Sequence, residues 1–341
     1  MKENKNLEFK STITNTFLKT VSAYRRSDTA SIEADQAELK ELVLQGSNLY
    51  FEELPCGRAD LAFKELNSKL MEKLGITAVS EDILRTLGLF TKDKKYNNAA
   101  ALLSDENDFY GIDMARFGNS INEIMDRETI EKTSVLKQYD AAVSMIKRYY
   151  QYEEISGIER KKIDLIPENA YREAIANSLI HRDWSINSHI RILMFQDRIE
   201  IKSPGGLPKG ITADEYVNGD ISCLRNPILG NVFFRMNYVE MFGTGVKRIL
   251  FAYKDAKIKP KFEITDNVIS VTLPIINNHY NVTEDEGKII NILENEGPLS
   301  SSKIAKMVGY TKSKTLRLMD SLKEKEYIKV IGNGRGTKYT L

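Results

Sequence analysis

Apolar residues in the last sixty positions of the chain recur at helical spacing in three successive stripes. Gly297-Pro298 and Gly309-Tyr310 interrupt the pattern, and such pairs end helices. Two alternating runs, 327–331 and 337–341, then flank a glycine-rich turn and predict a hairpin. The three stripes are Ile289, Ile290, Ile292 and Leu293; Ile304, Ala305 and Val308; and Leu316, Leu318, Met319 and Leu322.

Residues with side-chain oxygens stand at the start of each of these predicted helices. Thr283 with Glu286 three positions later fits a capping box, and Ser300 and Thr311 can cap the second and third helices. Helix, helix, turn, helix and hairpin is the order of a winged helix-turn-helix. Residues 282–341 are therefore predicted to form a separate winged-helix domain, joined to the rest by a polar linker at 277–281.

Basic residues gather in this predicted domain, although the formal net charge of the whole chain is only +1. Residues 282–341 carry eleven Lys or Arg against eight Asp or Glu, and no acid lies between Gly297 and Met319. Lysines and short hydroxyl side chains in the first turn of the third helix suit contacts with phosphates and base edges of duplex DNA. The alternative is a winged helix that contacts protein and leaves its basic face solvated. The candidate DNA-binding residues are Lys303, Thr311, Lys312, Ser313, Lys314, Arg317, Lys338 and, at the predicted wing tip, Arg335.

Residues 57–155 show mostly helical patterns of apolar residues. Two shorter segments, 99–104 and 111–116, interrupt these patterns and are predicted to be strands. This part of the chain is therefore predicted to be a largely helical segment that leads into a mixed domain.

Residues 156–276 alternate strand and helix patterns. Pro167 can stand in the first turn of a helix that runs to about Ile180. Short alternating runs separated by polar turns predict two hairpins. Strand pairs and helices without strict alternation predict an α+β layer sandwich rather than a doubly wound sheet. The paired runs are 189–195 with 198–202, and 261–265 with 268–273.

The predicted helix that ends near Ile180 has two different faces. Glu173, Asn177 and His181 follow one another at intervals of four and share a polar stripe. A carboxylate and an amide one turn apart can share a metal–water site. The opposite face is apolar and holds Tyr171, Ile175 and Leu179. Downstream stand His181-Arg182-Asp183-Trp184, Ser203-Pro204-Gly205-Gly206-Leu207-Pro208, Arg225-Asn226-Pro227 and Gly243-Thr244-Gly245.

These motifs, in this order, resemble the divergent GHKL-type ATP-binding module called RecG-like C-terminal, which occurs in bacterial transcriptional regulators. The resemblance covers about residues 99–276 and implies a GHKL-like α/β layer sandwich that binds ATP and Mg²⁺. It implies that Glu173 is the general base and that Asn177 holds the metal. The nucleotide-binding residues that it implies are Asn177, His181, Arg182, Asp183, Gly205, Gly206, Arg225, Asn226, Gly243, Thr244 and Gly245.

The chain departs from the GHKL pattern at the first glycine box. GHKL ATPases read adenine there with an aspartate, whereas this chain has Lys202, Ser203 and Pro204. The departure leaves three readings open: a nucleotide sensor, an ATPase, or a degenerate fold in which Glu173 and His181 only tie helix to loop. The sequence contains no Gly-x-x-x-x-Gly-Lys-Ser/Thr run, so a helicase motor is not expected.

Residues 1–56 resemble the two ends of a Schlafen-type AlbA domain without its glycine-rich middle. They are predicted to form a truncated remnant that includes an acidic helix at 35–44. The resemblance implies that Glu8 and Lys10 could be a nuclease-like pair in an intact domain, and here the favoured interpretation is a solvated pair. The segments that carry the resemblance are 6–10, 17–23, 34–39 and 46–48.

Composition narrows the class of protein. Cys56 and Cys223 lie far apart, and three histidines at scattered positions do not match metal-ligand spacing. The chain has no apolar stretch of the roughly 20 residues that span a bilayer, and its N-terminus lacks a signal-peptide core. These features predict a cytoplasmic protein without a membrane partner.

Together the patterns predict a DNA-binding transcriptional regulator with a nucleotide-sensing domain. A homodimer is expected, because two winged helices double the contacts that one half-site offers. The alternatives are an ATPase that uses Glu173 as base in a DNA-linked process, and an interaction scaffold without catalytic activity.

Overall fold

A computed structural model describes most of the chain from residue 49 onward. The chain divides into two compact units, Met1–Ile276 and Asn277–Leu341, and the second unit begins at the first residue of the predicted linker. Each unit is described by itself. The described residues are 22–23, 32–33, 44, 46, 49–156, 159–208, 210–218, 224–240, 243–256, 258–276, 283–325, 327–332 and 334–341.

A six-stranded sheet in the order β4-β3-β7-β8-β10-β9 is the framework of the first unit. β3 and β7 are parallel, and the other neighbours are antiparallel. The two hairpins predicted from alternation are confirmed as β7–β8 and β9–β10. The strands are β3 (Ile112–Phe117), β4 (Ile124–Ile130), β7 (Ile190–Met194), β8 (Arg198–Pro204), β9 (Lys261–Ile264) and β10 (Val268–Pro274).

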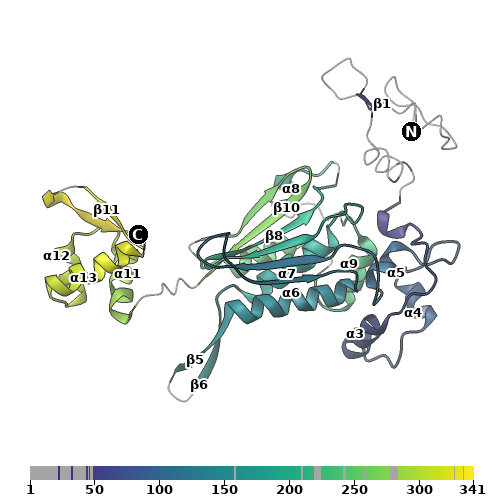
Figure 1. The fold of residues 1–341 in the computed structure, drawn as a ribbon, viewed down its shortest axis with the longest axis horizontal. Helices are drawn as coiled ribbons and strands as arrows, with labels where there is room; N and C mark the ends of the chain where they lie inside the picture. The colour runs from purple at the N-terminus through teal and green to yellow at the C-terminus, as the bar shows by residue number, and fades with distance from the viewer. Residues whose placement is uncertain are drawn as a thin grey trace. The chain divides into compact units, whose positions relative to one another are not determined.

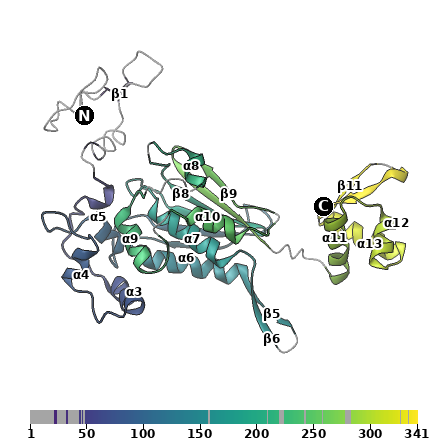
Figure 2. The same ribbon diagram turned by 180° about the vertical axis from the view of Figure 1, so that it is seen from behind.

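Three helices cover one face of this sheet, α6 (Val135–Tyr150), α7 (Glu168–Ile180) and α10 (Gly245–Ala252) (Figures 1 and 2). α7 is buried along most of its length, which matches the helix predicted from Pro167. Alternate residues of β8 and β10 are buried, as expected for a sheet with one covered face. The observed class is therefore α+β, as predicted. No described helix has both the length and the apolar character needed to cross a membrane.

Residues 51–103 form four short helices that precede the sheet in the chain. They are η1 (Phe51–Glu53), α3 (Lys64–Leu74), α4 (Glu81–Thr86) and α5 (Asn98–Leu103). The strand predicted at 99–104 is wrong, because this segment is α5. Asn97 caps α5 by accepting a hydrogen bond from the backbone N–H of Ala100. α5 is buried all round, and a short, uniformly apolar run has no period that separates helix from strand.

The strand predicted at 111–116 is confirmed as β3, but other strands of the first unit were not predicted. β4 and the hairpin β5 (Gln151–Ser156) with β6 (Glu159–Asp164) are strongly polar, so no apolar alternation marks them. The β5–β6 hairpin extends from the end of α6 (Figure 1).

Residues before 57 are described only in part. Ser22–Ala23 and Ile32–Glu33 form a short antiparallel pair, β1–β2. The predicted helix at 35–44 and the residues Glu8 and Lys10 lie almost wholly outside the described residues. Glu52 belongs to the first unit, since its buried carboxylate accepts hydrogen bonds from the N–H groups of Ile228 and Leu229 at the start of α9 (Pro227–Arg235).

The second unit has the predicted order of helices and hairpin. Thr283 and Glu286 form the capping box, and Thr311 accepts a hydrogen bond from the backbone N–H of Lys314. Ser300 stands at the N-cap of α12 without a side-chain cap bond. The elements are α11 (Glu284–Glu296), α12 (Ser301–Val308), α13 (Lys312–Glu324), β11 (Lys329–Ile331), η2 (Gly334–Gly336) and β12 (Lys338–Thr340). Their shared core includes Ile289, Ile304, Met319 and Leu322.

Candidate functional site

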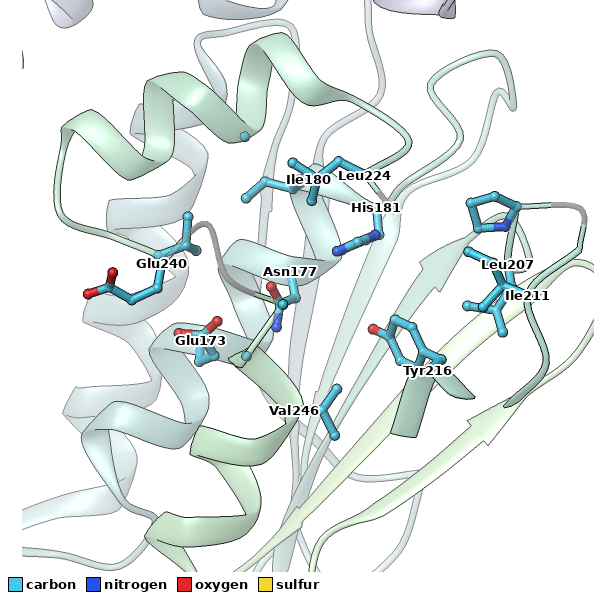
Figure 3. A pocket seen from close by; sticks show the side chains of 15 residues that line it. Glu173, Asn177, Ile180, His181, Leu207, Ile211, Tyr216, Leu224, Glu240 and Val246 are labelled. Atoms are coloured by element: carbon cyan, nitrogen blue, oxygen red, sulfur yellow. The ribbon is translucent and has the colours of Figure 1, made fainter. Parts of the chain in front are cut away.

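The polar stripe of α7 faces a pocket in the first unit. Glu173, Asn177 and His181 all line it, together with Gly243 and Gly245. The empty space between these residues is about 720 Å³, and part of it is open to solvent. The spacing of four residues on a helix thus brings these three side chains to one cavity (Figure 3).

Glu173 is the buried carboxylic acid at the polar end of the pocket, which it shares with Glu240. The whole Glu173 residue is 6% exposed to solvent. Burial raises the pKa of this carboxyl, while the charge of Arg248 and a hydrogen bond with Asn177 lower it again. Arg248 in turn forms an ion pair with Glu240, with 3.1 Å between Nη2 and Oε1. A buried carboxylate with a raised pKa beside an amide can act as a proton acceptor or position a water molecule.

Gly245 touches this pair of side chains so closely that a larger residue does not fit. A Cβ atom at this position would lie 2.5 Å from Glu173 Oε1 and 2.7 Å from Asn177 Nδ2. Gly245 is also the first residue of α10, whose N-terminal backbone N–H groups carry no helical partners. The arrangement therefore places helix amide groups beside a carboxylate and an amide, which suits a ligand with anionic groups and a cation.

The pocket also contains residues that were not predicted. Tyr216, on α8 (Ala213–Asn218), lies with Leu207 and Ile211 on the side opposite Glu173 and Glu240 (Figure 3). Their positions depend on packing between segments far apart in the chain, for which the sequence has no periodic signal. The remaining lining residues are Ile180, Pro208, Leu224, Gly230, Val239 and Val246.

Four predicted ligand residues form a separate cluster next to the pocket instead of lining it. Asp183 and Arg225 are 3.2 Å apart as an ion pair, and Arg225 also donates to the carbonyl oxygen of Gly206. A Cβ at Gly205 would lie 2.7 Å from Asp183 Cβ. Gly205 and Gly206 are therefore required for close packing of loops, and the described pocket lining does not include them.

Two further predicted ligand residues are buried in the protein. Arg182 is 1% exposed, donates to the carbonyl oxygens of Tyr110 and Ser188, and stacks on Trp184. Asn226 is equally buried and donates to the carbonyl oxygens of Ile180 and Arg182. Both hold loops together, so the structure gives them a supporting role. Thr244 stands at the N-cap of α10, outside the described lining.

The donor set of the pocket fits a metal-bound nucleotide better than a free anion. The described lining contains two carboxylates, Glu173 and Glu240, but no lysine or arginine. A polyphosphate next to these acids requires a cation that offsets the repulsion, and Mg²⁺ takes oxygen ligands from protein and phosphate together. Among the described residues, no group of three or more His, Cys, Asp or Glu could hold a metal ion. Asn177 could therefore contribute a ligand only alongside oxygens of the nucleotide and water.

The predicted DNA-binding residues of the second unit differ in how free they are. Lys303, Lys312, Ser313 and Arg317 are exposed, as is Lys338 on β12. Lys314 already has partners within the domain. Its Nζ lies 2.7 Å from Asp285 Oδ2 on α11 and 3.9 Å from the centre of the Tyr310 ring. Thr311 is exposed, although its hydroxyl oxygen already caps α13. The side chain of Arg335 lies outside the described residues.

Two family models match the chain. Residues 187–273 match the model described as "Putative ATP-dependent DNA helicase recG C-terminal", and residues 286–329 match winged helix-turn-helix DNA-binding. The chain therefore combines a RecG-like C-terminal ATPase-type domain with a winged helix-turn-helix of the DNA-binding class. Neither match reaches residues 1–56, so the resemblance to AlbA remains a prediction.

A solved structure shares the fold. The crystal structure of the DIP2311 protein from Corynebacterium diphtheriae aligns with a TM-score of 0.58 at 20% sequence identity, covering 94% of this chain and 70% of that chain. At this identity the similarity concerns the fold. No curated protein shows a significant sequence match.

Proposed function

We propose that this protein is a cytoplasmic DNA-binding transcriptional regulator whose ATPase-like domain senses ATP with Mg²⁺. The proposal is carried by the presence of two features in one chain. The winged helix exposes Lys312 and Arg317, and in the pocket Gly245 lies against Glu173 and Asn177. A homodimer would place two such winged helices on a pair of half-sites. Bound nucleotide would change the affinity for DNA.

The DNA-binding half is tested by the double substitution Lys312→Ala with Arg317→Ala. Both side chains are exposed on the helix that would enter the major groove. The variant is expected to bind a fluorescent duplex at least about tenfold more weakly, and the slope of log K against log salt should fall by about 2, since two phosphate contacts are lost. Lys314→Ala should cost less than about threefold, because Asp285 already pairs with this lysine. Fluorescence anisotropy over a salt series measures both quantities.

The exposed Lys92 of the first unit is the matched control, and Lys92→Ala should bind DNA like the wild type. Unchanged affinity of the double variant would refute duplex binding through α13. The same titration with ATP and Mg²⁺ tests sensing: nucleotide should shift the Kd for DNA of the wild type but not of Asn177→Ala. If ATP and Mg²⁺ do not change the Kd of the wild type for DNA, the proposal that the domain senses nucleotide is refuted.

A second candidate function is ATP hydrolysis with Glu173 as the base. The observation that favours it is the buried carboxylate with a raised pKa next to Asn177. Glu173→Gln keeps the shape and removes the base, so it is expected to lower phosphate release by at least about a hundredfold while ATP binding persists. A coupled phosphate assay measures the rate. Equal release by wild type and variant would assign the activity to another group or a contaminant.

A further inference from the structure

The pocket has two chemically different ends. Glu173 and Glu240 lie at one end, with Asn177 near the middle (Figure 3). At the other end, the rings of His181 and Tyr216 stand almost perpendicular, at 87°, with their centres 6.0 Å apart. Apolar side chains surround these two rings: Ile180, Leu207, Ile211 and Leu224. The lining therefore favours a ligand that is charged at one end and largely apolar at the other.

The aromatic end disfavours charge. Burial, together with the charge of Arg225, lowers the pKa of the His181 imidazole to about 4. Burial, with a contribution from Glu173, raises the pKa of the Tyr216 phenol to about 12. Both side chains are therefore neutral near pH 7, and the phosphate groups of a nucleotide are expected at the opposite end.

Hydrogen-bonding capacity remains free at this end. Within the described part of the chain, neither ring nitrogen of His181 nor the hydroxyl of Tyr216 has a hydrogen-bond partner in the protein. A neutral imidazole offers one donor and one acceptor, and a phenol can both donate and accept. Both residues are partly exposed and line the pocket, so their polar atoms are accessible to a ligand edge that carries donors and acceptors.

The first glycine box offers no competing acceptor. The buried Ser203 hydroxyl donates to the carbonyl oxygen of Ser178 over 2.8 Å and is turned into the protein. Two acids lie against the glycine loop, Asp183 at Gly205 and Asp266 at Gly206; both are outside the described lining, and Asp183 pairs with Arg225. An acceptor-only carboxylate, which would select the amino group of adenine, is therefore missing from the aromatic end.

We infer that His181 and Tyr216 bind the purine base of the nucleotide and that the site accepts adenine and guanine with similar affinity. The inference rests on nucleotide binding in the proposed function. Adenine presents a donor and an acceptor on its pairing edge, and guanine presents the same two functions in reversed positions with its N2 amino group as a second donor. Both edges are satisfied here, because the imidazole can change tautomer and the phenol hydroxyl can rotate.

Calorimetric titration of the full chain with Mg²⁺ and ATP, GTP or inorganic tripolyphosphate tests this inference. Wild-type affinities for ATP and GTP should agree within about threefold. His181→Ala and Tyr216→Phe should each weaken both nucleotides by about tenfold, the equivalent of one hydrogen bond, and leave tripolyphosphate unchanged. His189→Ala and Tyr149→Phe remove the same groups outside the pocket, where they contact Glu131 and Asp126, and should bind like the wild type.

The outcomes separate the inference from the proposal beneath it. Nucleotide binding that the two pocket variants leave unchanged, or a preference of more than about tenfold for ATP, would overturn the base assignment alone. An equal loss of tripolyphosphate affinity would also overturn it, because the substitutions would then act on the phosphate end. If the wild type binds neither nucleotide, both the inference and the nucleotide-sensing proposal fail. Tyr216→Phe retains the ring, so its melting temperature should match that of the wild type.

Discussion

Replacing Arg182 with alanine is expected to lower the free energy of unfolding of the first unit by about 4 kcal/mol. The guanidinium is almost completely buried and donates to the carbonyl oxygens of Tyr110 and Ser188. Alanine removes these donors and leaves a cavity next to Trp184, whose ring centre lies 4.2 Å from the guanidinium carbon. Burial lowers the pKa of Arg182 to about 10, so the side chain is still charged at neutral pH. Urea unfolding followed by the fluorescence of Trp184, the single tryptophan of the chain, measures the loss.

A matched control separates this effect from a general loss of positive charge. Arg127 pairs with Asp113 on the outer part of the sheet, and its side chain is 58% exposed. Arg127→Ala should therefore cost less than about 1 kcal/mol. If Arg182→Ala unfolds at the same urea concentration as the wild type but no longer binds nucleotide, Arg182 is a ligand residue and its supporting role is refuted. Arg182→Lys should also destabilise the unit, because an ammonium cannot reach both carbonyl groups as the guanidinium fork does.

Features that depend on local sequence were predicted well. The stripe of Glu173, Asn177 and His181 follows from helical spacing, and the pocket receives all three. The hairpins β7–β8 and β9–β10 follow from alternation and polar turns. The winged helix was predicted because each helix has a stop or cap in its own sequence, such as the box formed by Thr283 and Glu286.

Features that depend on contacts between distant segments were not predicted. Arg182 follows His181 directly, but helix spacing does not show that its side chain turns toward Tyr110 and Ser188. Lys314 looked like its basic neighbours in the sequence, and only the packing of α11 against α13 brings Asp285 to it. Tyr216 lies on α8, and the loop between β8 and α8 brings it to the pocket. The local pattern of apolar and polar residues does not predict this position.

Glu286→Gln is expected to destabilise the winged helix by about 2 kcal/mol at pH 7 and by almost nothing near pH 2. The carboxylate is 2% exposed and accepts hydrogen bonds from Ser321, Lys325 and the backbone N–H of Thr283. Burial opposes the charge, but these hydrogen bonds outweigh it and lower the pKa of Glu286 to about 2 from the usual 4.5.

The sign of this pH dependence follows from the depressed pKa. The unfolded chain takes up a proton near pH 4.5 and the folded domain only near pH 2, so the stabilisation is complete above about pH 5 and is lost as the pH falls through this window. Methyl NMR signals of Ile289 and Ile304, both fully buried in this domain, report its unfolding in the full chain. Asp320→Asn, an exposed acid on α13, is the control and should change stability little at any pH. A deficit of Glu286→Gln that stays constant from pH 7 to about 2.5 would mean that the glutamate acts through shape and not through its charge. Glu286 joins the start of α11 to the end of α13. Protonation of its carboxylate at low pH should therefore unfold the domain, and DNA binding should be lost at the same pH.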